Sequence, residues 1–213
     1  LNRANQQIHD SIAETPALRG MGCTMVTAYF EDKNLWWTSV GDSHLYLVRN
    51  RELIKQNADH SYGAYIDLMK EQGMDIEEQP GMSRNMLMSA MTGEEISSID
   101  CPDSPAKLKS GDRLIISSDG LDTLGAGAII QYSSWSSTAR ECVYALLKAV
   151  EEANKINQDN TTIIVVDIKE KAQSVEDVQA AKESLSKATH EEEEKKAKSK
   201  QPSESRSYKW LIW

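Results

Sequence analysis

Short apolar stretches alternate with polar turns between residues 23 and 54, and this pattern limits the possible folds more than any other feature. The stretches are rich in β-branched and aromatic residues and occupy residues 23–30, 35–40, 45–48 and 53–54. Polar turns such as Glu31–Asn34 separate them. Short strands joined by tight turns usually pair as hairpins, so the segment predicts an antiparallel sheet.

The other elements are grouped around this sheet and do not alternate strictly with its strands. Apolar spacing predicts helices over residues 2–13, 61–72 and 138–153, with Gly73 as the stop of the second. Continuous apolar runs predict strands over residues 113–117 and 161–168. This grouping favours an α+β layered fold over a dinucleotide-binding parallel sheet.

Composition divides the chain near residue 169. Beyond that point the sequence is almost entirely Glu, Lys, Ser, Ala and Gln, so residues 1–168 must supply the hydrophobic core. Residues 169–209 are predicted to be a charged, solvated linker. Four apolar residues at helical spacing predict a short amphipathic helix in part of it, namely Val175, Val178, Ala181 and Leu185.

The two ends of the sequence suggest continuation beyond them. The helix predicted over residues 2–13 has the pattern of the later part of a longer helix. At the other end, Lys209 precedes the apolar run 210–213, a pattern typical of the start of a transmembrane segment. Two interpretations stay open here, a membrane anchor beyond residue 213 or a frayed tail.

The net charge limits the kinds of binding partner that the chain can have, and the cysteine content indicates its cellular compartment. The net charge is −9 and the pI is about 5.0, which argues against a nucleic-acid binder because neutralising phosphates needs a basic surface. The three cysteines are widely spaced and form no CxxC pair, so neither a disulfide framework nor a zinc ribbon is indicated. We expect a reducing, cytoplasmic location, with the membrane anchor as a tether to the cytoplasmic face.

Three aspartates lie at the ends of predicted strands. Asp42 follows the strand over 35–40, Asp119 follows the strand over 113–117, and Asp159 precedes the last strand. Carboxylates at strand ends can converge at one edge of a sheet and share hard cations such as Mg²⁺ or Mn²⁺. Each aspartate taken alone is also a common turn residue, so the combination carries the prediction.

Six motifs, in order from Gly20 to Ile168, resemble those of the PP2C (PPM) family of metal-dependent protein phosphatases, and its bacterial branch most closely. The matching segments are Gly20–Thr24 (GMGCT), Val40–Asn50 (VGDSHLYLVRN), Asp59–Ser61 (DHS), Arg84–Leu87 (RNML), Gly111–Leu121 (GDRLIISSDGL) and Asp159–Thr162 (DNTT). The family patterns are GMGTT, VGDSRAYLxR, DHS, RNxLxxALG, GDxLLLCSDGL and DNxT. No single motif decides the matter, but their order and spacing agree.

The resemblance implies a β-sandwich flanked by helices in α-β-β-α layers, with a metal cluster at one end. It implies hydrolysis of phosphoserine and phosphothreonine on proteins by metal-activated water, with substrates supplied by a cognate kinase. On matching positions, Asp119 and Asp159 would be ligands of a core pair of Mn²⁺ or Mg²⁺ ions. Asp42 would help to hold a third, looser metal.

The sequence also departs from the family. The family's N-terminal segment carries a phosphate-binding Arg, an acidic ligand and a DGxGG(H) motif, and none of these is present. We therefore expect a sandwich incomplete at its N-terminus, and we expect this chain alone to be weakly active or inactive as a phosphatase because these metal ligands are absent. Position 44 is His where the family usually has Arg, and we interpret it as a surface replacement and not a ligand. The alternative function is therefore a non-catalytic PP2C-like module for binding or sensing.

Overall fold

The computed structural model describes residues 1–170, of which Leu1–Lys169 form one folded unit. Nearly all of the linker predicted over 169–209, and the whole apolar run 210–213, lie outside the described residues. Within residues 1–170, no helix combines the length and the apolar character needed to cross a membrane.

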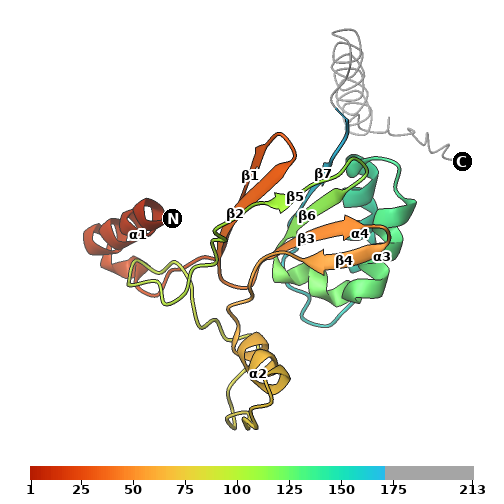
Figure 1. Cartoon of the computed structure of the whole chain (residues 1–213). Helices are drawn as coiled ribbons and strands as arrows, with labels where there is room; N and C mark the ends of the chain where they lie inside the picture. The colour runs from red at the N-terminus through yellow and green to blue at the C-terminus, as the bar shows by residue number, and fades with distance from the viewer. Residues whose placement is uncertain (171–213) are drawn as a thin grey trace, which may run out of the picture. The chain divides into compact units, whose positions relative to one another are not determined.

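The first sheet has three antiparallel strands in the order β1-β2-β5 (Figure 1). They are β1 (Met25–Glu31), β2 (Asn34–Val40) and β5 (Ala106–Lys107). Glu31 pairs with Asn34, so a two-residue turn joins β1 to β2, and Asp32 in this turn has a φ of 54°. Asp tolerates this left-handed conformation, which explains the tight hairpin.

The second sheet has four antiparallel strands in the order β4-β3-β6-β7. They are β3 (His44–Arg49), β4 (Glu52–Lys55), β6 (Arg113–Ser117) and β7 (Ile163–Asp167). Asn50 and Arg51 join β3 to β4 and both have positive φ values, 52° and 65°, as a type I′ hairpin turn requires.

The two sheets enclose one hydrophobic core and the helices enclose a second. Between the sheets lie five buried leucines, Leu35, Leu45, Leu47, Leu108 and Leu114, with side chains of both sheets packed against them. On the other face of the four-stranded sheet, α3 (Gly125–Trp135) and α4 (Ala139–Glu152) contribute Ile129, Cys142, Leu146 and Val150 to a cluster with Val48 and Ile115. The chain thus has the expected α+β sandwich with helices packed on it.

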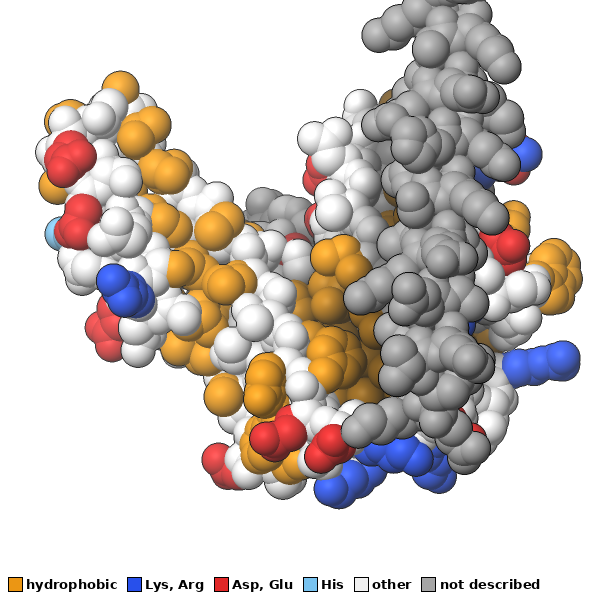
Figure 2. Space-filling view, turned by 90° about the horizontal axis from the view of Figure 1, so that it is seen from above, with side chains coloured by type: hydrophobic (Ala, Val, Ile, Leu, Met, Phe, Trp, Pro, Cys, Tyr) orange, Lys and Arg blue, Asp and Glu red, His pale blue; other side chains and the backbone are white. Residues whose placement is uncertain are grey.

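The other helical elements are α1 (Asn2–Glu14), η1 (Pro16–Leu18), α2 (Tyr62–Glu71) and η2 (Asp119–Leu124). α1 buries no side chain, and Asn5 links it to the loop at Gly93 and Glu94 through two hydrogen bonds. Apolar side chains remain exposed near the N-terminal part of the fold, including Leu18, Met21, Tyr29 and Phe30. Seen from above, this face of the molecule shows many exposed hydrophobic side chains (Figure 2).

Among residues 1–170, each predicted helix and strand occurs, with ends shifted by at most two residues, whereas the helix predicted within 175–185 lies outside the described residues. Four of the described elements were not predicted, the short strand β5, helix α3 and the 3₁₀ helices η1 and η2. The sequence of α3, GAGAIIQYSSW, is poor in strong helix formers, and burial of Ile129 against the sheet stabilises it instead.

Candidate functional site

The strand register brings the three predicted aspartates to one end of the four-stranded sheet. Ser117 of β6 pairs with His44 of β3 on one side and with Ile163 of β7 on the other. Asp42 lies two residues before His44, and Asp119 lies two residues after Ser117. Because antiparallel neighbours start and end at the same edge, both aspartates and the loop that carries Asp159 meet there.

A polar pocket of about 330 Å³ lies at this edge. Five aspartates line it, the three predicted ones together with Asp59 and Asp122. The other lining residues are His44, Ser61, Asn85, Gly120, Thr123, Lys155, Asn157 and Gln158. The structure therefore gathers Asp42, Asp119 and Asp159 in one pocket, as the sequence predicted.

Asp42 is held at the pocket by the turn that precedes it. Gly41 has a φ of 98°, and a Cβ atom there would lie 2.3 Å from Thr24 Cγ2, so only glycine fits. The Gly41 N–H donates to His60 Nδ1 at 3.0 Å, and the His60 N–H donates to the Gly41 carbonyl at 3.1 Å. Burial raises the pKa of Asp42, and the nearby charge of Asp119 raises it further.

Asp119 and Asp159 are fixed by hydrogen bonds between their two loops. The Ser118 N–H donates to the Thr162 carbonyl, and the Thr162 N–H donates to Ser118 Oγ, both at 3.1 Å. The Gln158 amide donates to the carbonyls of Gly120 at 3.0 Å and Asp159 at 2.9 Å. These bonds tie the end of β6 to the loop before β7, so the two aspartates keep a fixed separation.

Asp59 comes from the DHS segment and was not predicted as a site residue. Its carboxylate accepts from Lys55 Nζ at 2.6 Å and from the Ser61 N–H at 3.0 Å. Burial raises the pKa of Asp59, but these hydrogen bonds and the charge of Lys55 outweigh it, and the net effect lowers the pKa. Asp59 therefore adds a stable negative charge to the pocket wall.

His44 is not a surface residue, and that prediction was wrong. Its side chain is only 3% exposed and lines the pocket, and Nε2 lies 2.9 Å from Asp122 Oδ1, although without hydrogen-bond geometry. The ring also packs against Tyr46, with 5.1 Å between centroids. The period of two along β3 places His44 on the same face as Tyr46 and Val48, which pack toward the helices, and this signal was available in the sequence.

The pocket offers the right donors for a hard divalent cation. Its carboxylate oxygens are the ligands that Mg²⁺ and Mn²⁺ prefer, and Mg²⁺ is commonly held by one or two carboxylates with water and phosphate completing its shell. Among residues 1–170, however, no group of three or more His, Cys, Asp or Glu side chains is placed to hold a metal by itself. The described residues thus fit a cation that keeps several non-protein ligands.

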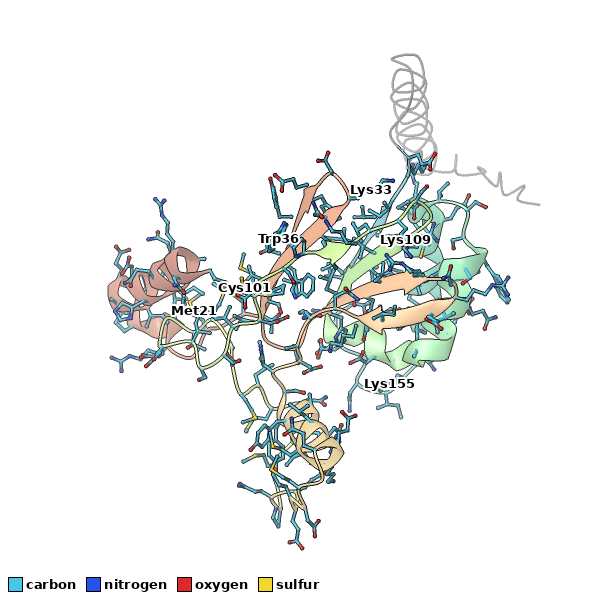
Figure 3. The ribbon with its side chains drawn as sticks, in the orientation of Figure 1. Met21, Lys33, Trp36, Cys101, Lys109 and Lys155 are labelled. Carbon is cyan, nitrogen blue, oxygen red and sulfur yellow. The ribbon has the colours of Figure 1, made fainter. Side chains whose placement is uncertain are left out.

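Lys155 is the only lysine or arginine among the described residues that line this pocket. Figure 3 shows it on the loop between α4 and β7. It has no carboxylate partner within ion-pair distance in the described part of the chain. A cation beside a carboxylate pocket can attract an anionic ligand.

Two bacterial phosphatases are similar to this chain in sequence, although no protein-family model matches it. The serine/threonine protein phosphatase PstP of Mycobacterium tuberculosis is 25% identical over 166 residues, covering 77% of this chain and 31% of PstP. The protein phosphatase PhpP of Streptococcus pneumoniae is 29% identical over 127 residues, covering 60% of this chain and 50% of PhpP. The chain therefore spans 31% of the length of PstP and 50% of the length of PhpP.

Solved structures show the same fold. A crystal structure of Mycobacterium tuberculosis PstP matches 78% of this chain and 68% of its own, with a TM-score of 0.64 and 26% identity. The PstP catalytic domain in complex with two manganese ions matches with a TM-score of 0.63 and 25% identity, over 78% and 67% of the two chains. The phosphatase Stp1 of Staphylococcus aureus, at 22% identity and a TM-score of 0.62 over 78% and 63%, supports the fold alone.

Proposed function

We propose that this chain is a bacterial PP2C-type protein phosphatase and that its carboxylate pocket serves metal-dependent hydrolysis of phosphoserine and phosphothreonine on proteins. One observation supports this above the others, the convergence of Asp42, Asp119 and Asp159 in a single pocket at the end of the sandwich. The two manganese ions of the PstP catalytic domain make Mn²⁺, or the similar Mg²⁺, the expected cofactor.

The residues would divide the work as follows. Asp119 and Asp159 would hold the core metal pair, since their loops are tied together by the Ser118 and Gln158 hydrogen bonds. Asp42 would contribute to a third, looser site. When bound, such metals activate water for attack at phosphorus and neutralise the charge that develops. Lys155 would attract the phosphate to a pocket that is otherwise strongly negative.

The like-charge crowding of the pocket supports a cation-binding role. The pKa of Asp42 is raised by burial first and by Asp119 second, so the empty pocket disfavours full ionisation. A divalent cation would reverse this effect, because it stabilises each carboxylate that faces it. Binding of metal should therefore release protons near the acid end of the pH range.

Substrates and location follow from the same proposal. The partners would be proteins phosphorylated on serine or threonine by a cognate kinase. We also propose that the phosphatase is tethered to the cytoplasmic face of a membrane, which rests on the sequence pattern at 209–213 alone. Flotation of the full-length protein with liposomes tests the tether, and recovery only in the soluble fraction would contradict it.

The first test is a Mn²⁺ titration of the 213-residue chain and of the full-length protein. Calorimetry measures binding, and turnover of p-nitrophenyl phosphate and a phosphothreonine peptide measures activity in the same samples. Saturable binding with metal-dependent turnover supports the proposal. Metal or phosphopeptide binding without turnover would favour a non-catalytic binding or sensing module. The observation that favours this alternative is the lack of a three-ligand group among residues 1–170.

A further inference from the structure

A second, less polar groove of about 430 Å³ borders the carboxylate pocket. The two share Asp59 and Ser61, so the segment that carries these residues forms the wall between them. The groove extends from this wall along α2, and its further lining residues are Ala58, His60, Ala64, Tyr65, Leu68, Met88, Ser89, Ser97 and Ser98.

Three large apolar side chains face this groove and remain unusually exposed. Tyr65 is 39% exposed, Leu68 49% and Met88 45%. Tyr65 and Leu68 are three residues apart on α2, so they lie on the same side of the helix. Exposed apolar side chains gathered beside a polar pocket are typical of a binding surface.

Hydrogen bonds hold the groove open in one shape. The Met88 N–H donates to the His60 carbonyl at 2.8 Å, which fixes the segment containing Met88 beside the wall. On the far side, Ser89 Oγ donates to the Ser98 carbonyl at 2.7 Å and accepts from the Ser98 N–H at 3.0 Å. Ser61 caps α2 by accepting from the Ala64 N–H at 3.2 Å. A ligand would therefore meet a preformed surface, which lowers the entropic cost of binding.

We propose that this groove binds an apolar side chain near the phosphorylated residue of a protein substrate, which rests on the function proposed above. An extended peptide advances roughly 3.3–3.6 Å per residue. A phosphoresidue in the carboxylate pocket therefore places its neighbours, a few residues along, over the shared wall and into the groove. The substrate class is a phosphoserine or phosphothreonine peptide with Leu, Met or a similar residue two or three positions from the phosphate.

Sets of four fluorescent peptides, one set for each position of the flanking residue, test the groove and the pocket separately. They combine phosphothreonine or threonine with leucine or serine at one flanking position, and the flanking residue is moved from position −3 to position +3. Fluorescence polarisation measures binding to the 213-residue chain with Mn²⁺. The phosphopeptides carry a non-hydrolysable phosphonate analogue of phosphothreonine, so that turnover cannot convert them into their threonine partners. We expect the leucine phosphopeptide to bind about tenfold more tightly than its serine partner in at least one register, because an apolar side chain leaves water.

Matched variants show whether the preference for leucine depends on the groove. In Leu68→Ser and Tyr65→Ser the preference for leucine should fall to within about twofold. It should persist in Tyr144→Ser, where a half-exposed tyrosine on α4, which does not line the groove, is changed in the same way. Circular dichroism confirms that the variants are folded, and the comparison of peptides on the unchanged chain does not depend on them.

The outcomes separate the two proposals. Equal affinity for leucine and serine phosphopeptides in every register overturns the groove and leaves the phosphatase proposal standing. A leucine preference that is the same with and without phosphate supports the groove and contradicts the role of the carboxylate pocket. If no peptide binds at all, both proposals fall.

Discussion

Gly120 packs so closely against Thr161 that a Cβ atom at position 120 would lie 2.5 Å from Thr161 Oγ1 and 2.7 Å from the Asn160 carbonyl oxygen. This contact joins the residue after Asp119 to the two residues after Asp159. The separation of the two predicted metal ligands thus depends on the absence of a side chain at position 120.

Gly120→Ala should push the loop before β7 away from the end of β6. We expect a loss of about 1–3 kcal/mol in the free energy of unfolding from overpacking, and weaker Mn²⁺ binding because the ligands separate. Urea unfolding and calorimetric Mn²⁺ titration measure the two effects. The control is Gly127→Ala in α3, where a Cβ meets nothing within 4 Å and the change should be neutral or mildly stabilising. Unchanged metal affinity in Gly120→Ala would contradict this account.

Asp119→Asn and Asp159→Asn each remove one charged ligand while keeping the shape of the side chain. In the full-length protein, we expect each to lower metal-dependent turnover by at least about a hundredfold and to weaken Mn²⁺ binding. Turnover of a phosphothreonine peptide across a Mn²⁺ series measures both effects. Asp103→Asn, at an exposed position outside the pocket, serves as the control. Wild-type turnover by either variant would remove that residue from the metal site.

The main strands and the three aspartates could be predicted because their signals are local. Each strand is a short apolar run with a turn beside it, and two of the aspartates directly follow such runs. The pairing of His44 with Ser117 brings Asp42 and Asp119 together. The family resemblance suggests this pairing, but only the folded sheet shows it.

The sequence did not predict Asp59 and Asp122 as site residues because neither lies directly at the end of a predicted strand. Asp59 enters the pocket through the DHS turn, and Asp122 through a 3₁₀ helix that the sequence did not reveal. Helix α3 was missed for a related reason, since its glycines and serines lower the helix propensity and only tertiary packing of Ile129 compensates. These positions depend on contacts between distant parts of the chain.

His60 should titrate below its ordinary pKa of 6.5. Burial lowers this pKa, and the charges of Asp100 and Asp59 oppose the shift without cancelling it. Because Nδ1 accepts a hydrogen bond from the Gly41 N–H, the neutral ring is the form that fits the fold. The unfolded chain gains this proton first as the pH falls, so the contribution to stability is present above pH 6.5 and is lost below it.

An NMR titration of the full chain between pH 4.5 and 8 measures this pKa directly, with His60→Gln to assign the signal. A pKa at or above 6.5 would contradict the buried hydrogen bond to Gly41. Solvent screening of the half-buried ring keeps the expected stability effect below about 0.5 kcal/mol, so the titration is more decisive than unfolding.

Arg49 and Asp112 form an ion pair at the end of the sandwich opposite the site. The guanidinium donates to Asp112 through Nε at 2.8 Å and Nη2 at 2.6 Å, and the Lys109 N–H donates to the same carboxylate at 2.6 Å. The residue Asp112 is 4% exposed. Burial raises the pKa of Asp112, but the hydrogen bonds from Arg49 and Lys109 and their charges outweigh burial and lower it below 3.8.

Asp112→Asn should lower the free energy of unfolding at pH 7 by about 3 kcal/mol, because it leaves the Arg49 charge without its partner. The folded pKa of Asp112 lies below the unfolded value, so its contribution is present above pH 3.8 and is lost as the pH falls through the folded pKa. Urea unfolding at pH 7 and at pH 3 should therefore show the gap between wild type and variant narrowing in acid. Lys148→Gln, which breaks only the exposed pair with Glu152, should change stability by less than about 0.5 kcal/mol. A gap that stays constant with pH would mean that packing, and not charge, sets the role of Asp112.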